Sequence, residues 1–132
     1  MDKLPTIKTA LCLSADLFDL ELVTEKLGIN PTGTRTKDSF SLSEFAHTVW
    51  FIELFEEECW AISIPLEKLF ALIDGKVETI KSLCDEYGLR ATIVITIKMN
   101  HGERPLMDIS RELVSFTAAI NAEIGFDLYC YE

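Results

Sequence analysis

The chain has 132 residues, of which 48% are hydrophobic, and its formal net charge at pH 7 is −10. A chain of this length buries one hydrophobic core, and so apolar a composition excludes global disorder. Contact with phosphate backbones needs clustered Lys and Arg, so the charge argues against nucleic acid as a ligand. We therefore expect a single domain over residues 1–132.

The first third of the chain predicts a strand, a helix and a loop. Residues 6–15 are largely apolar and β-branched, which is typical of a buried strand. Residues 19–27 fit a short helix, because Asp19 can accept hydrogen bonds at its N-terminus and Gly28 can end it. Residues 31–43 are polar and rich in turn-forming residues, which predicts a loop.

The middle of the chain leaves one element open. Residues 46–55 predict a central strand, and the three glutamates at 56–58 follow it as an acidic turn. The apolar piece within residues 58–64 fits either a hairpin strand or a direct entry into the next helix. Residues 65–87 have helical spacing of apolar side chains, with a break predicted near residues 74–75.

The last third predicts a strand over residues 89–99, a helix over about 108–123 and a final strand over 126–131. Strands and helices thus alternate along the chain. This order favours an α+β two-layer sandwich, in which helices cover one face of a four- or five-stranded sheet. The nearest common architecture is the ferredoxin-like one, which we adopt as an analogy.

Nothing in the sequence predicts insertion into a membrane or export. No apolar run reaches the roughly 20 residues that a membrane span requires. The N-terminus also lacks the basic and then apolar pattern of a signal peptide. We expect a cytoplasmic protein that makes no contact with a membrane.

The four cysteines are predicted to be reduced thiols in the core. Cys12, Cys59, Cys84 and Cys130 show no CxxC or Cys/His spacing, and each lies in an apolar stretch. A disulfide between Cys12 and Cys130 requires the first and last strands to be neighbours, and the sequence leaves that point open.

Several segments resemble one known family. They are LGINPT at 27–32, Trp50, ERPLM at 103–107 and above all ELVSFTAAINAEIGFDLYCYE at 112–132. In this order they resemble the bacterial family catalogued as domain of unknown function 4279, and the resemblance is weakest between residues 53 and 65. It implies a small bacterial α+β protein with no assigned reaction. Some bacterial families of this size serve as immunity proteins in toxin systems, which makes that role a hypothesis here.

Catalytic and metal-binding patterns are absent from the sequence. His47 and His101 are the only histidines, and neither has a partner motif that would activate a nucleophile. The histidines and carboxylates do not reproduce the spacing of zinc or calcium sites, and the glycines form no phosphate-binding loop. We therefore expect no enzyme activity, no metal and no cofactor.

The distribution of charge is the strongest functional indication. Residues 44–67 contain six acidic residues and no basic one, and residues 108–132 contain five acidic residues and one basic one. The first segment interleaves its acids with large aromatic side chains, a combination suited to protein recognition. The predicted partner-binding residues are Trp50, Glu53, Phe55, Glu56, Glu57, Glu58 and Trp60.

Three interpretations of these residues remain open. The plainest is that alternate residues of a strand face the core and the acids are a solvated turn. The leading functional hypothesis is a non-enzymatic protein-binding domain, most concretely an immunity-type protein whose acidic surface neutralises a basic toxin such as a nuclease. The alternative is a regulatory domain for a small ligand, with an anion site at Arg35 and Lys37 in the 31–43 loop. The oligomeric state stays open in all three.

Overall fold

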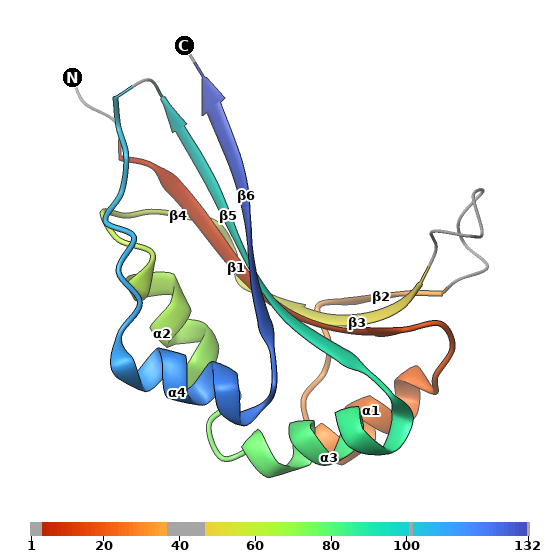
Figure 1. Ribbon diagram of the computed structural model, residues 1–132. Coiled ribbons are helices and arrows are strands. Elements are labelled where there is room, and N and C mark those ends of the chain that lie inside the picture. Colours follow the sequence, from red (N-terminus) through yellow and green to blue (C-terminus); the bar gives the residue numbers. More distant parts are fainter. Residues whose placement is uncertain (1–3, 37–46, 101, 132) are drawn as a thin grey trace.

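The structure is a computed structural model that describes residues 4–36, 47–100 and 102–131 (Figure 1). No helix among these residues is both long enough and apolar enough to cross a membrane. They form four helices and six strands, which in chain order are β1 (Thr6–Ala15), α1 (Leu20–Leu27), β2 (Gly33–Arg35), β3 (Thr48–Glu53), β4 (Glu57–Glu58), α2 (Ser63–Leu72), α3 (Val77–Tyr87), β5 (Arg90–Asn100), α4 (Arg111–Ala119) and β6 (Glu123–Tyr131).

The strands form one mixed sheet in the order β2, β3, β1, β5, β6, and β4 also pairs with β1. Within the described strands, every pairing is antiparallel except that of β5 with β6. The helices lie on one face of this sheet (Figure 1). The α+β class is therefore confirmed. The ferredoxin-like sandwich of four or five strands is wrong, because the described residues form six strands in a different order.

The two unexpected strands, β2 and β4, lie where the sequence predicts a loop and a turn. β2 pairs with β3 at the edge of the sheet, where Gly33 lies opposite Phe51. β4 pairs with the first residues of β1, where Glu57 lies opposite Ile7. Both strands are short and mostly polar, so neither shows the alternation of apolar residues that marks a half-buried strand. Their strand conformation comes from pairing with the neighbouring strands β3 and β1.

The core lies between the helices and the long central strands β1 and β5, which are paired over nine residues. Alternate side chains of these strands point toward the helices, and Ile7, Leu11, Ile93 and Ile97 are fully buried there. Burying one such side chain contributes about 1.5–3 kcal/mol. We call this side of the sheet the helix face and the opposite side the open face, where most side chains of β1 and β5 are half-buried.

The helix ends follow the sequence closely. Asp19 accepts hydrogen bonds from the backbone N–H groups of Glu21 and Leu22 at 3.0 and 3.2 Å, and Gly28 ends α1 with a φ of 68°. The predicted break near residues 74–75 separates α2 from α3. The apolar piece within residues 58–64 leads into the next helix and does not form a hairpin strand, because β4 ends at Glu58 and α2 begins at Ser63.

The four cysteines are free thiols, and their burial differs from the expectation of core positions. Cys59 is buried, Cys12 and Cys84 are half-buried, and Cys130 is exposed on β6. β1 and β6 pair with opposite edges of β5, so Cys12 and Cys130 are not neighbours and cannot form a disulfide.

We predict that these thiols differ widely in reactivity. Burial raises the pKa of Cys84 to about 11, so only about one thiol in a thousand is ionised at pH 8. Iodoacetamide should therefore modify the exposed Cys130 first and Cys84 far more slowly, as followed by peptide mass spectrometry. Unfolding in denaturant is the control, since it should make the rates similar. Equal rates in the native protein would contradict the described burial.

Candidate functional site

A β-bulge separates β3 from β4 along the same edge of β1. Ala10 lies opposite Glu53, and Ile7 lies opposite Glu57. Two residues of β1 therefore face three residues of the other chain segment, at 54–56. An extra residue of this kind bends its strand and increases the local twist. Figure 1 shows the sheet bending where β3 ends.

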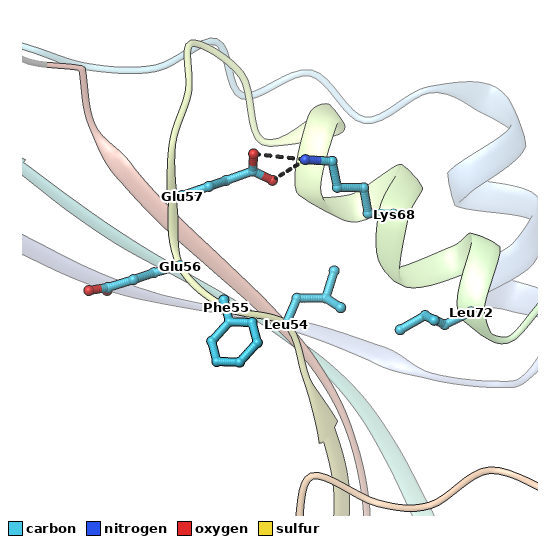
Figure 2. A pocket seen from close by; sticks show the side chains of 6 residues that line it. All are labelled: Leu54, Phe55, Glu56, Glu57, Lys68 and Leu72. Carbon is cyan, nitrogen blue, oxygen red and sulfur yellow. Dashed lines mark hydrogen bonds and ion pairs between the residues drawn. The ribbon is translucent and has the colours of Figure 1, made fainter.

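The bulge divides the acidic residues between the two faces of the sheet. Side chains alternate along a strand, so one extra residue reverses the alternation beyond it. Glu53 lies on the open face, where it is 3.3 Å from Lys8. Glu57 instead lies opposite the core residue Ile7 and faces α2, where Lys68 Nζ donates to its two carboxylate oxygens at 2.9 and 2.8 Å (Figure 2).

Glu56 forms a third ion pair, since its carboxylate lies 3.3 Å from Lys98 of β5 on the open face. Three of the acids predicted to form one acidic surface are thus paired with lysines. These lysines come from three different elements, namely β1, α2 and β5. Glu58 is exposed and forms no ion pair with another described residue. The continuous acidic surface expected from the sequence is therefore replaced by acids on two faces, most of them neutralised locally.

Phe55 is the exposed apolar residue of the bulge. Its side chain is 97% exposed. Beside it a depression of about 370 Å³ lies between the bulge and α2. In Figure 2, Leu54 and Leu72 point into this space, while Phe55 points away from α2. We call the residues that line the depression the bulge surface: Leu54, Phe55, Glu56, Glu57, Lys68 and Leu72.

A second depression, of about 430 Å³, also borders Phe55. Leu54, Phe55 and Glu56 line both depressions, so the two lie next to each other at the bulge. The second one contains two of the ion pairs described above. Its lining consists of Lys8, Thr32, Glu53, Leu54, Phe55, Glu56 and Lys98.

Trp50 does not belong to any binding surface, contrary to the sequence prediction. It is 0% exposed, and its indole Nε1 donates to Thr24 Oγ1 at 2.9 Å. The reason is the alternation of β3, which directs Thr48, Trp50 and Ile52 toward the core. Trp60, by contrast, is 64% exposed between β4 and α2. The two tryptophans thus have different environments, and the sequence prediction, which grouped them as aromatic residues, did not separate them.

Of the two residues predicted for the alternative ligand site, the structure describes Arg35. Arg35 is exposed at the end of β2, and its guanidinium carbon lies 5.8 Å from the centre of the Phe51 ring. Lys37 and His101 lie outside the described residues, and His47 is exposed just before β3. Among the described residues, no group of three or more His, Cys, Asp or Glu side chains is placed to hold a metal ion.

The comparisons with known proteins found one family. The family model described as "Domain of unknown function (DUF4279)" matches residues 5–131. No match was found among curated proteins or among solved structures.

We predict that Glu56 controls the pKa of Lys98. A hydrogen bond to Glu56 and the charge of its carboxylate raise that pKa above its ordinary value, because both favour the protonated amine. Glu56→Gln should therefore lower the pKa of Lys98, as measured from the pH dependence of its side-chain NMR signals. Glu58→Gln is the matched control and should leave it unchanged. A pKa insensitive to Glu56→Gln would show that this ion pair does not form in solution.

Proposed function

The chain belongs to the DUF4279 family, and we propose that it is a non-enzymatic protein-binding domain whose partner contacts the bulge surface. One observation carries this proposal: a phenylalanine that is 97% exposed stands beside an apolar depression. Buried aromatic side chains supply much of the binding energy at protein interfaces, especially where they meet a pocket. Phe55 offers the aromatic ring, and the depression between Leu54 and Leu72 can accept an apolar side chain of the partner.

The backbone holds Phe55 in place before any partner arrives. On one side, the N–H of Leu54 donates to the carbonyl of Thr9 at 3.0 Å. On the other side, Glu57 pairs with Ile7 of β1. A side chain on a fixed backbone loses little entropy on binding, because only its own rotamers are restricted. This supports the assignment of Phe55 as the central contact.

The charges around Phe55 favour a basic partner. Glu56 and Glu57 flank it, and each is bound to a lysine that remains partly exposed. Exposed ion pairs of this kind contribute only about 0–1 kcal/mol, so an arginine of a partner can replace either lysine at small cost. The net charge of −10 also attracts a basic protein from a distance.

The narrower form of the proposal is an immunity-type protein that neutralises a basic toxin. A nuclease, for example, needs a basic cleft to attract phosphates, and an acidic protein can cover that cleft. A toxin gene next to the gene for this chain would support this form, and a metabolic operon would oppose it. The small-ligand alternative at Arg35 and Lys37 stays a prediction, because Lys37 lies outside the described residues.

We predict that Phe55→Ala weakens partner binding without unfolding the domain. The stability should change by less than about 0.5 kcal/mol, because the side chain is exposed. Binding should weaken by about tenfold to a hundredfold, as for other central aromatic contacts. Leu17→Ala is the matched control, since Leu17 is 69% exposed outside the bulge surface.

The measurement has two stages. Wild type and both variants are first used to isolate bound proteins from the cells that produce the chain. A protein retained by wild type and Leu17→Ala, but lost with Phe55→Ala, is then titrated by calorimetry against all three. Equal affinity of wild type and Phe55→Ala for every protein isolated would exclude the bulge surface as the binding site.

We further predict that the position of the acids matters, as well as their number. Replacing Glu56, Glu57 and Glu58 by lysine should slow association with that partner at least about tenfold at low salt. The control variant replaces Glu78, Asp85 and Glu86 by lysine, which changes the net charge equally on the exposed side of α3. Stopped-flow rates should fall much less for the control. Equal rates for both variants would leave only the net charge as the cause.

A further inference from the structure

The strand β6 forms an exposed edge of the sheet. In the described part of the chain only β5 pairs with it, in a parallel register that continues without interruption from Glu123 to Tyr131. Four of its large side chains are between 42% and 51% exposed, namely Phe126, Leu128, Tyr129 and Tyr131. The outer side of this strand therefore offers free backbone groups flanked by apolar side chains.

Sheet edges in soluble proteins are normally protected against pairing with other chains. Short edge strands, lysines, prolines and bulges are the usual means. The opposite edge, β2, is three residues long and ends in Arg35. β6 has nine residues, none of them basic or proline, and it contains no bulge. Such an edge is a template for another strand, because its outward N–H and C=O groups have no strand partner among the described residues.

We propose that β6 pairs in antiparallel fashion with β6 of a second copy, about a two-fold axis at Leu128. The strand's own sequence restricts the axis to few positions. An axis at Asp127 would place the two Asp127 carboxylates opposite each other. An axis at Gly125 would place Asp127 of one copy opposite Glu123 of the other. Like charges directly opposite each other are destabilising. An axis at Phe126 would centre the contact nearer to the half-buried start of β6, next to α4, and away from the exposed end of the strand.

The axis at Leu128 uses the exposed end of the strand and matches side chains on both faces. On the helix face, Leu128 meets its own copy and Phe126 meets Cys130, so apolar side chains face one another. On the open face, Asp127 lies opposite Tyr129 of the second copy. Within one chain the hydroxyl of Tyr129 already donates to Asp127 Oδ2 at 3.0 Å, so the same bond can form between the copies.

Gly125 completes the match. In this register it lies opposite Tyr131 of the second copy on the open face. A Cβ atom at Gly125 would meet nothing within 4 Å, so there is space for the tyrosine ring. A glycine in a strand is weakening by itself, and an aromatic ring from the neighbouring strand covers it. The two copies then share one continuous sheet, with the helices of both on the same face.

Charge sets the conditions under which this dimer forms. Each copy carries a net charge of −10, so two copies repel each other at low ionic strength. Salt screens this repulsion, and the dimer should therefore strengthen as salt is added. Binding of a basic partner at the bulge surface should respond to salt in the opposite direction. The two proposals can thus fail independently.

Disulfide trapping tests the register. In a Cys130→Ser background, Leu128→Cys places a thiol against its own copy and should give a covalent dimer on mild oxidation. Phe126→Cys in the same background should not, because residue 126 lies opposite residue 130. Phe126→Cys with Cys130 retained should cross-link again. Cross-linking of Leu128→Cys no greater than in the Cys130→Ser control, or preferential cross-linking of Phe126→Cys in that background, would overturn the proposed axis.

Sedimentation equilibrium tests the association without new thiols. The wild-type chain should change from monomer to dimer between about 1 µM and 1 mM at high salt, a range typical of weak interfaces. Leu128→Lys should remain monomeric with an unchanged circular dichroism spectrum, because it places two ammonium groups at the axis. Leu106→Lys, at another exposed leucine, should still dimerise. A wild-type chain that stays monomeric throughout would refute the dimer.

Discussion

One extra residue in the strand that runs along β1 sets the arrangement of the candidate site. Between Glu53 and Glu57 the chain contains one residue more than the facing part of β1. This bulge exposes Phe55, turns Glu57 toward α2 and leaves Glu56 on the open face. Without it, side chains would continue to alternate and Glu57 would point away from Lys68. The exposed ring, both flanking ion pairs and the depression all depend on this local change of register.

The elements with strong local patterns could be predicted from the sequence. β1 and β5 contain long runs of β-branched and apolar residues, and α1 has both a capping aspartate and a terminal glycine. β2 and β4 could not be predicted, since their strand conformation comes from pairing with β3 and β1. Secondary structure that a neighbour imposes leaves little trace in the local sequence. The ferredoxin-like analogy failed because the order and direction of the longer strands, β3, β1, β5 and β6, are set by tertiary pairing.

The candidate site was predicted in part. The sequence located Phe55 and the surrounding glutamates, but it gave no indication of their partners, because Lys8, Lys68 and Lys98 lie in other elements. Counting charges along the chain therefore overstated the acidity of the surface. The sequence also predicted Trp50 as a partner-binding residue, whereas it is buried in the core. Its residue type could not decide this, since aromatic residues serve equally well in a core and at an interface. Its hydrogen bond to Thr24 in α1 became evident only in the fold.

Lys98 connects the two proposed surfaces. It lies in β5, opposite Tyr129 of β6, and its amine is 3.3 Å from Glu56 at the bulge. A basic partner that takes over the Glu56 carboxylate leaves this amine without its counter-ion. Lys98 lies opposite Tyr129, next to the proposed axis at Leu128, so a positive charge there would offset part of the repulsion between two acidic copies. If both proposals hold, the Lys98 ammonium group is the charge through which partner binding at the bulge would influence self-association at β6.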